Sequence, residues 1–350
     1  MAQQNAAYCT PAIGLDPPPA AARRPDSPSL LRGHVATIAA FVTNGLASDL
    51  PSSVPFRFHV SGGSCGPATL TGLYFPTPGS RELVILLHGM GGNVHSAYQR
   101  RATSALCALG MSVLRLGQRG SSRDPEDLHH AGLWEDLAAV LRDDATVARY
   151  ERVYVVGFSM GGHVALHLAA ARRPRLAAVV SICSPLYLDG AVRHMDRPES
   201  AVYRRHVLAG LRHMYRDIAR RRPVPVSPSE VDRAETLRAW DHLTVVRRFG
   251  FRDPTDYYES QSAGRILGAL ATPALLLYSP QDPMVPPSTL AGLEAHERRS
   301  PAVRVAWMDG GGHIAFPRRL DLGLGPAVPC TPYEQIAAWL RRQPAPEAAS

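Results

Sequence analysis

Short apolar runs recur along the middle of the chain and alternate with stretches that have the apolar spacing of helices. Each run is apolar at nearly every position, which indicates a strand buried on both faces of a sheet. The runs cover residues 83–87, 112–116, 153–156, 274–278 and 303–307. Strands and helices that alternate in this way predict an α/β fold with a mostly parallel central sheet flanked by helices.

Two further runs, 55–60 and 68–75, are separated by a turn rich in glycine and serine. They predict an antiparallel hairpin at one edge of the sheet. The pattern changes again after residue 184. From there to about residue 262 Arg, His and Tyr are common, helical periodicity is clear around residues 201–222, and buried strands are not evident. This predicts a helical cap inserted into the core.

The two ends of the chain have little apolar surface to bury, and three consecutive prolines lie near the start. Such composition is typical of flexible segments. The predicted organisation has five parts: a flexible N-terminal arm (1–28), a first part of the α/β core (29–183), the helical cap (184–270), a second part of the core (271–342), and a flexible tail (343–350).

All 38 basic residues of the 350-residue chain are arginines, and lysine is absent. This excludes Schiff-base chemistry, a lysine general base and the lysine of a phosphate-binding loop, because arginine stays protonated. The net charge of +8 raises the question of nucleic acid. Residues 184–262 hold 14 arginines and 11 acidic residues, an excess of only +3. We therefore expect an ion-paired, solvated surface rather than a groove for nucleic acid.

The cysteines are widely spaced and form no pattern typical of a metal site. They are Cys9, Cys65, Cys107, Cys183 and Cys330. Apolar runs stay well below the roughly 18 residues of a membrane span, and the N-terminus lacks the layout of a signal peptide. We expect reduced thiols in a cytoplasmic protein without a membrane span. Transient contact with lipid is compatible with this expectation.

The segment 157–161, Gly-Phe-Ser-Met-Gly, directly follows the apolar run 153–156 and precedes the helix-like stretch 162–171. This is the arrangement of a nucleophile elbow, a sharp strand-to-helix turn that exposes a serine hydroxyl. Glycines flank the serine because side chains there would crowd the crossing of strand and helix. The pattern predicts that Ser159 is a catalytic nucleophile. The competing interpretation is a glycine-rich turn with an inert serine.

The same Gly-x-Ser-x-Gly spacing occurs a second time, in residues 62–66. A chain of this length matches the pattern by chance roughly one time in ten, given the usual frequencies of glycine and serine. A strand, and not a helix, follows the earlier match. We therefore predict that Ser64 is a turn residue.

A serine at its ordinary pKa needs a general base, and the base needs an acid that orients it. In this architecture both lie downstream of the serine, in the order acid then histidine. Asp282 follows the run 274–278, and His313 follows three glycines just beyond the run 303–307. We predict Asp282 as the acid and His313 as the base. Asp309 is the rival acid, but it lies close to His313 in sequence, and a turn-forming Asp-Pro is the competing interpretation of Asp282.

A tetrahedral intermediate also needs donors for its oxyanion. The residue after the nucleophile, Met160, supplies one backbone N–H at a helix N-terminus. The second is expected from the turn 88–92, His-Gly-Met-Gly-Gly, and we assign it to Met90. This turn could instead bind phosphate, but it matches neither the P-loop nor the dinucleotide pattern.

These residues in this order resemble the alpha/beta hydrolase superfamily, and more narrowly its YheT-type branch of predicted hydrolases and esterases. The resemblance covers roughly residues 30–342. Blocks that carry the narrower resemblance are Gly33-His34 with Thr37, His88-Gly89 with Ser96 and Tyr98, Arg115-Leu116 with Arg119-Gly120, Gly132 with Asp136-Leu137, the stretch 202–206, and 250–253 with 256–258. The sequence departs from the branch at Gly91, where an acidic residue is typical, and at His163, where asparagine is common.

The resemblance implies activity on esters, since relatives are described as short- and medium-chain esterases, phospholipid hydrolases or alcohol acyltransferases. The hypothesis is hydrolysis of carboxylic esters of short to medium acyl chains through an acyl-serine, with small-molecule esters or lipids as substrates and without a metal or organic cofactor. Tyr98 is expected near the mouth of an apolar acyl pocket. Alternatives are acyl transfer to an alcohol or lipase action with the same triad and, in another class, a non-catalytic ligand-binding fold. The sequence leaves the physiological substrate and the oligomeric state open.

Overall fold

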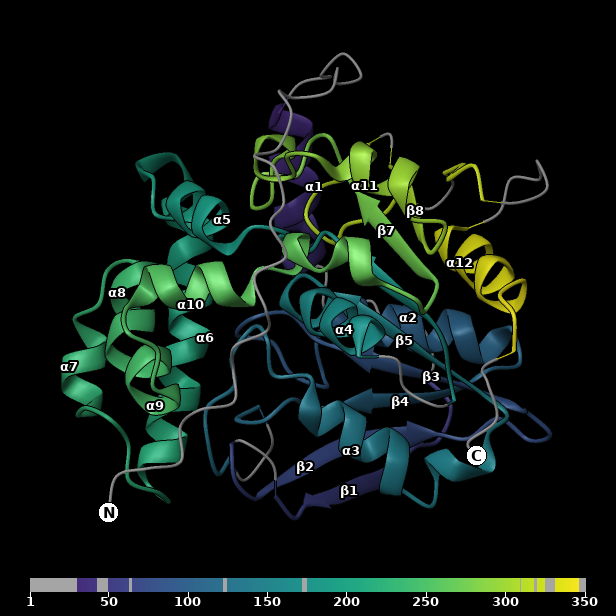
Figure 1. Cartoon of the computed structure of the whole chain (residues 1–350), viewed down its shortest axis with the longest axis horizontal. Helices are drawn as coiled ribbons and strands as arrows, with labels where there is room; N and C mark the ends of the chain where they lie inside the picture. Colours follow the sequence, from purple (N-terminus) through teal and green to yellow (C-terminus); the bar gives the residue numbers. More distant parts are fainter. Residues whose placement is uncertain are drawn as a thin grey trace.

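The computed structural model describes residues 30–42, 50–62, 65–121, 125–171, 175–308, 310–317, 320–324 and 331–345. Several predictions fall outside these ranges: the N-terminal arm (1–28), residues 346–350 of the tail, the turn serine Ser64 and the rival acid Asp309. Within the described residues the chain forms an α/β fold around one eight-stranded sheet. Figure 1 shows this sheet beside a separate group of helices.

The strands of the sheet follow the order β1-β2-β4-β3-β5-β6-β7-β8. Their bounds are β1 Val54–Val60, β2 Ala68–Phe75, β3 Glu82–Leu87, β4 Ser112–Leu116, β5 Arg152–Phe158, β6 Leu176–Ile182, β7 Ala274–Tyr278 and β8 Val303–Trp307. The first two strands form an antiparallel hairpin at one edge, and β2 also runs antiparallel to β4. All other neighbours are parallel. The mostly parallel sheet and its edge hairpin confirm the fold expected from the sequence.

Strand β6 was not among the strands expected from the sequence, although all seven of its residues are buried. It comes soon after the elbow helix α4 (Met160–Ala170), and alanines occupy two of its first three positions. Alanine favours helix, so a continuous apolar run of this composition is hard to distinguish from more buried helix. The strand becomes evident only through its pairing with β5 and β7.

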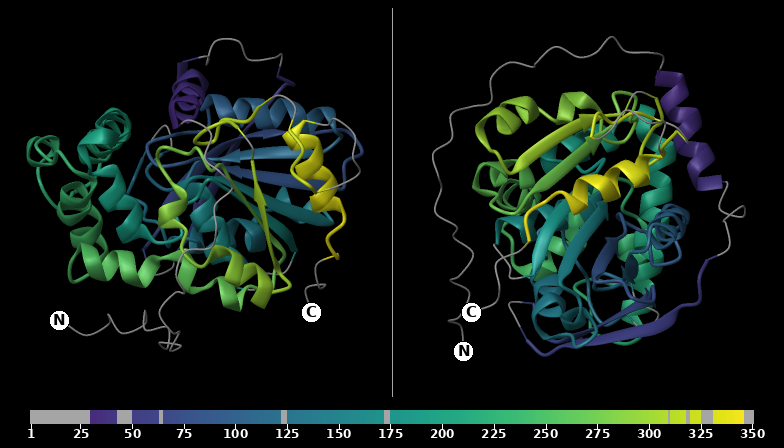
Figure 2. Two further views of the ribbon diagram at one scale, coloured as in Figure 1. Left: turned by 90° about the horizontal axis from the view of Figure 1, so that it is seen from above. Right: turned by 90° about the vertical axis from the view of Figure 1, so that its right-hand side faces the viewer.

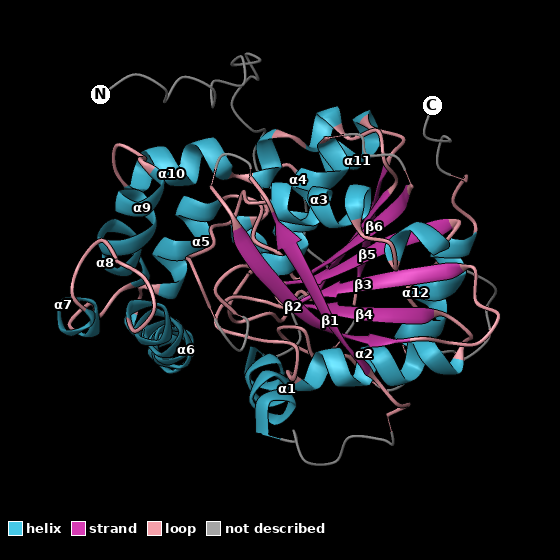
Figure 3. Cartoon of the chain, turned by 90° about the horizontal axis from the view of Figure 1, so that it is seen from below, coloured by secondary structure: helices cyan, strands magenta, loops and turns pink. Residues whose placement is uncertain are grey.

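Helices cover both faces of the sheet, as Figure 3 shows. On one face, Ala102 and Ile336 pack in a core with the strands, on helices α2 (Ala97–Ala108) and α12 (Pro332–Arg341). On the other face, Leu137, Val164 and Leu293 belong to a second core, on helices α3 (Glu135–Asp143), α4 and α11 (Leu293–Arg299). Because helices cover both faces of the sheet, the parallel strands are apolar at nearly every position.

The chain between β6 and β7 is helical and lies to one side of the sheet (Figure 2). Its helices are α5 Leu188–Met195, α6 Ala201–Ala219, α7 Pro228–Asp232, α8 Leu237–Asp241, α9 Arg247–Phe249 and α10 Pro254–Gln261, with a π-helical turn at His242–Val246. Short 3₁₀ turns occur at Val147–Arg149, Pro198–Ser200, Ala263–Arg265, Leu267–Ala269 and Pro287–Thr289. The helices between β6 and β7 have an apolar core of their own, which reaches Met160 and Met284 of the main body. The cap predicted at 184–270 contains these helices, and we refer to their span, residues 188–261, as the cap.

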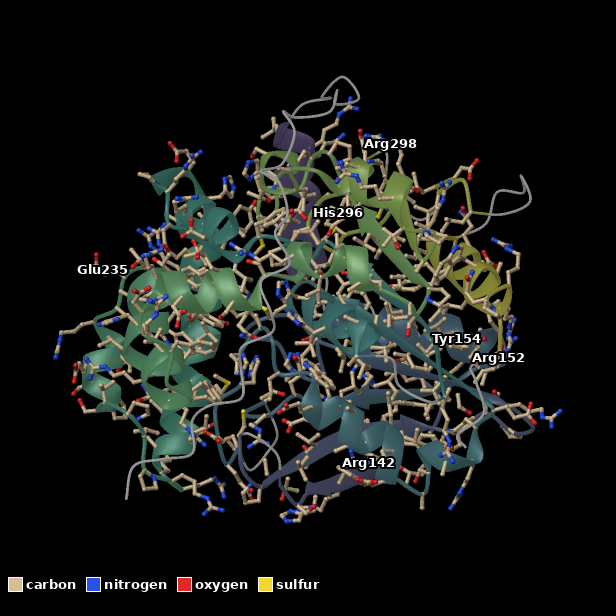
Figure 4. All side chains as sticks on the ribbon, in the orientation of Figure 1. Arg142, Arg152, Tyr154, Glu235, His296 and Arg298 are labelled. Carbon is tan, nitrogen blue, oxygen red and sulfur yellow. The ribbon has the colours of Figure 1, made fainter. Side chains whose placement is uncertain are left out.

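Charged side chains project from the surface throughout the molecule, and Figure 4 shows Arg142 and Glu235 among them. Several arginines pair with neighbouring acids, including Arg142 with Asp143 at 2.6 Å and Arg216 with Asp232 at 2.8 Å. Among the described helices, none combines the length and the apolar character that crossing a lipid bilayer requires.

Candidate active site

Ser159 lies at the sharp turn between β5 and α4 and has the positive φ of 51° that the elbow pattern predicts. A Cβ on Gly157 would lie 2.2 Å from the Gly161 carbonyl oxygen, so glycine is required where strand and helix cross. Two backbone contacts hold the strained turn: the Ser159 N–H donates to the Ile182 carbonyl at 2.7 Å, and the Ser184 hydroxyl donates to the Ser159 carbonyl at 2.6 Å. The turn is thus stabilised by the end of β6.

Asp282 and His313 come together at the carboxyl ends of β7 and β8. Nδ1 of His313 lies 2.8 Å from Oδ2 of Asp282, and both side chains are buried. The other carboxylate oxygen accepts the backbone N–H groups of Met284 and Val285 at 2.8 and 2.9 Å. Because the carboxylate is held on both oxygens, it fixes Nδ1–H as its donor and leaves Nε2 of the imidazole as the acceptor.

Ser159 and His313 line one cavity of about 60 Å³, together with Met90 and Met160. The rest of its lining is apolar and comes largely from the cap and the Asp282 loop: Pro185, Leu188, Ala191, Val192, Met195, Val207, Leu237, Met284 and Val285. The structure therefore places the predicted nucleophile, base and both oxyanion residues around a single apolar space. The predicted acid lies directly behind the base.

Met90 and Met160, the two residues predicted to supply oxyanion donors, line the same cavity as Ser159. Met160 is the first residue of α4, so its N–H has no partner within the helix. Met90 lies in the turn after β3, which is closed by a hydrogen bond from Gly92 N–H to the Gly89 carbonyl at 3.0 Å. Both residues reach the cavity of Ser159.

Tyr98 lies beneath this turn and not in the cavity lining, which corrects the position expected from the sequence. Its hydroxyl accepts the Gly89 N–H at 2.9 Å, and its ring packs on Phe158 with centroids 4.8 Å apart. The sequence resemblance drew attention to Tyr98 but did not indicate that its side chain is buried beneath the turn. The side chain therefore supports the turn that holds Met90.

Gly91 and His163, the two residues at which the sequence departs from the YheT-type branch, both connect the main body to the cap. Gly91 contacts α6 so closely that a Cβ on Gly210 would lie 2.7 Å from the Gly91 carbonyl oxygen. His163 places Nδ1 2.6 Å from the Pro185 carbonyl and Nε2 2.7 Å from that of Gln261, at the end of α10. Burial lowers the pKa of His163, although both carbonyls favour its charged form. These contacts fix the cap against helix α4 and the turn 88–92.

Cys183 is a neighbour of the acid and base that sequence analysis did not identify. Its sulfur, a carboxylate oxygen of Asp282 and a ring nitrogen of His313 all lie within 4.8 Å of one another, and all three residues are buried. Burial, together with the Asp282 carboxylate, raises the pKa of the thiol well above its ordinary value. The sulfur therefore stays protonated, which does not favour metal ligation by a thiolate. The signal that could have located Cys183 is its position directly after β6, but this strand was not among those expected from the sequence.

The cap arginines face away from the cavity. Arg204 donates to the backbone carbonyls of Met195 at 3.0 Å and Arg197 at 2.8 Å, and Arg205 is exposed. Neither belongs to the cavity lining. These two arginines therefore do not identify an anionic group in the substrate.

Comparisons with known proteins agree with this fold. Residues 84–321 match the family described as "Alpha/beta hydrolase family". "Putative esterase YheT" of Escherichia coli (strain K12) is 27% identical over 240 residues, which cover 67% of this chain and 70% of that protein. "Monoacylglycerol lipase" of Saccharomyces cerevisiae is 20% identical over 219 residues, 59% of this chain and 49% of that protein. Among solved structures, a 2,6-dihydroxy-pseudo-oxynicotine hydrolase is similar in fold, with a TM-score of 0.53 and 18% identity over 85% of this chain and 71% of that one.

Proposed function

The chain belongs to the alpha/beta hydrolase family, and from this premise we propose that it is a serine esterase that cleaves carboxylic esters through an acyl intermediate on Ser159. The observation that carries the proposal is the buried His313–Asp282 pair at 2.8 Å, next to a cavity that His313 shares with Ser159. A module that only binds a ligand does not need an oriented base beside a half-buried serine in a strained turn.

In the proposed mechanism, Nε2 of His313 accepts the proton of the Ser159 hydroxyl as its oxygen attacks the ester carbonyl. Asp282 holds the imidazole in the required tautomer and stabilises its charged form. The N–H groups of Met90 and Met160 bind the oxyanion, and His313 then gives the proton to the leaving alcohol. Water activated by the same histidine cleaves the acyl-serine, which returns the free enzyme.

The small volume and apolar lining of the cavity support a short apolar acyl group as the part of the substrate that binds there. Its volume of about 60 Å³ corresponds to roughly four or five water-sized groups. Four methionines line it, Met90, Met160, Met195 and Met284, and their flexible side chains adapt to different acyl shapes. The name of the yeast relative supports glycerol esters as one group of substrates to test.

A series of p-nitrophenyl esters with increasing acyl length tests this assignment. Each methylene buried in the cavity contributes about 0.8 kcal/mol, so kcat/KM is expected to rise by roughly fourfold per methylene. We expect a maximum at about four to six acyl carbons, where the cavity is filled, and a fall beyond it. An optimum at twelve or more carbons would contradict the role of this cavity as the whole acyl site.

Covalent labelling tests the nucleophile directly. A fluorophosphonate probe is expected to label the folded protein once, and peptide mapping is expected to find the label on Ser159. The second Gly-x-Ser-x-Gly serine, Ser64, provides an internal control because it has the same flanking spacing. Labelling of Ser64 alone, or labelling only after denaturation, would overturn the proposed function.

A further inference from the structure

Helix α1 (Leu30–Val42) contacts both loops that carry the proposed acid and base, although it precedes the matched family region 84–321. Its residues Gly33, His34 and Thr37 form the first block of the sequence resemblance, and the acyl-transfer mechanism leaves them without a role. Each of the three makes a different contact with the active-site region. These contacts come from a segment far from Asp282 and His313 in sequence.

Thr37 is fully buried and uses its hydroxyl twice. The oxygen accepts the backbone N–H of His313 at 2.9 Å and donates its own proton to the Gly33 carbonyl at 2.7 Å. A Cβ on Gly312 would lie 2.3 Å from this hydroxyl oxygen, so the histidine loop approaches α1 through a residue without a side chain. The backbone of His313 is therefore anchored to α1.

The loop that carries His313 needs such an anchor because its backbone is strained. Gly310 and Gly311 both have φ of 86°, and Ile314 has a positive φ of 51°. A β-branched residue in this conformation is costly and persists only where surrounding contacts hold it. The hydrogen bond from the His313 N–H to the Thr37 hydroxyl holds the backbone between Gly311 and Ile314, two of the residues with positive φ.

Gly33 contacts the loop that carries the acid. A Cβ at this position would lie 1.9 Å from the Gln281 carbonyl oxygen, one residue before Asp282. Any side chain at Gly33 would push α1 and this loop apart. The same helix turn thus packs on both catalytic loops at once.

His34 extends the contacts of α1 to the cap. Its Nδ1 lies 2.7 Å from the hydroxyl of Tyr203 on α6, and the two rings stack with centroids 5.7 Å apart. Val207, one turn further along α6, lines the cavity of Ser159. Helix α1 therefore joins the acid loop, the histidine loop and the cap.

We propose that α1 is a positioning element of the active site, in which Thr37 and Gly33 set the relative placement of the Asp282 and His313 loops. The proposal rests on the proposed esterase function. Thr37 does not touch the reacting atoms; it acts through the backbone of His313. Loss of its hydroxyl is expected to lower the rate of the chemical step without weakening substrate binding.

The test compares Thr37→Val with Thr37→Ser on the full chain, with p-nitrophenyl butyrate as substrate. Valine keeps the shape of threonine but removes both hydrogen bonds, whereas serine keeps them. We expect Thr37→Val to lower kcat by about 10- to 100-fold with KM within about twofold of wild type, and Thr37→Ser to restore most of kcat. Values of kcat are normalised to the sites counted by fluorophosphonate titration, so that unfolded protein does not contribute.

Two further variants separate positioning from general damage to the helix. Ile38→Ala changes the exposed residue next to Thr37 and is expected to keep wild-type kcat. Gly33→Ala improves helix propensity but inserts a Cβ against Gln281, and it is expected to lower kcat as Thr37→Val does. Wild-type kcat in Thr37→Val or Gly33→Ala, or equal loss in Thr37→Val and Thr37→Ser, would overturn the positioning role. Failure of the esterase assignment is distinguishable, because wild type itself would then show neither turnover nor labelled Ser159.

Discussion

Ser159→Ala is expected to lower kcat for p-nitrophenyl esters by about 10³- to 10⁶-fold, with little change in KM. The substitution removes the attacking oxygen, and the remaining rate comes from the oxyanion donors and from binding alone. The fold is expected to persist because both contacts that hold the turn, to Ile182 and from Ser184, use the backbone of residue 159. Steady-state kinetics on the purified variant, with circular dichroism as a check of folding, measures this effect.

The control for this substitution is Ser64→Ala, which alters the other serine with the same glycine spacing. It is expected to retain wild-type kcat and KM. Undiminished turnover in Ser159→Ala would refute the nucleophile, and with it the roles given to His313 and Asp282. Equal losses in the two variants would point to a nonspecific effect of the substitutions.

Much of this arrangement could be predicted because parallel strands present their carboxyl ends at one edge of the sheet. The sequence places Ser159 after β5, Asp282 after β7 and His313 after β8, and the sheet topology brings these three ends to the same side. Only local patterns were needed: an apolar run, a turn and a residue of suitable chemistry. The same logic located the turn of Met90 after β3.

Contacts between distant segments could not be predicted in the same way. Thr37 and His313 are separated by 276 positions, and no local pattern indicates that one accepts a hydrogen bond from the other. Cys183 follows a strand that resembled helix in its composition, so its place beside Asp282 was hidden. Tyr98 was associated with the site by resemblance, but its depth depends on how α2 packs under the turn. The positions of these three residues depend on how distant segments pack together, and the spacing of apolar residues along the chain does not reveal this packing.

Acidification is expected to unfold the protein with a midpoint between about pH 3.5 and pH 5, because several imidazoles are buried in neutral form. Burial lowers the pKa of His88 from 6.5 to about 4, and burial with neighbouring histidines lowers that of His130 and His167 to about 3. Burial also lowers the pKa of His129 and His163. None of these residues belongs to the proposed triad.

The direction of the effect follows from proton uptake by the two states. Below about pH 6.5 an unfolded imidazole binds a proton, whereas a folded one among these stays neutral until its lowered pKa is reached. The free energy of unfolding therefore falls on acidification, by about 1.4 kcal/mol per pH unit for each such histidine. A domain with about 5–15 kcal/mol of total stability loses it within a few pH units when several histidines act together.

Asp241 in the cap acts in the opposite direction. Burial raises its pKa from 3.8 to about 7, and the Tyr258 hydroxyl donates to its Oδ2 at 2.7 Å. Between about pH 7 and pH 4 the folded chain holds a proton here that the unfolded chain has released, so acidification stabilises this site. Its contribution offsets that of one histidine.

Two single substitutions with opposite expected signs test this account by urea unfolding at a series of pH values. In His167→Gln the amide can still donate to the Gln261 carbonyl, which lies 2.9 Å from Nε2 of His167, but it does not titrate. The slope of unfolding free energy against pH between about pH 4 and pH 6 should become shallower by about 1.4 kcal/mol per pH unit. In Asp241→Asn the side-chain carbonyl still accepts from Tyr258, and the slope should become steeper by a similar amount. Identical slopes in wild type and His167→Gln would show that this imidazole is not held neutral by the fold, and the acid sensitivity would then need another source.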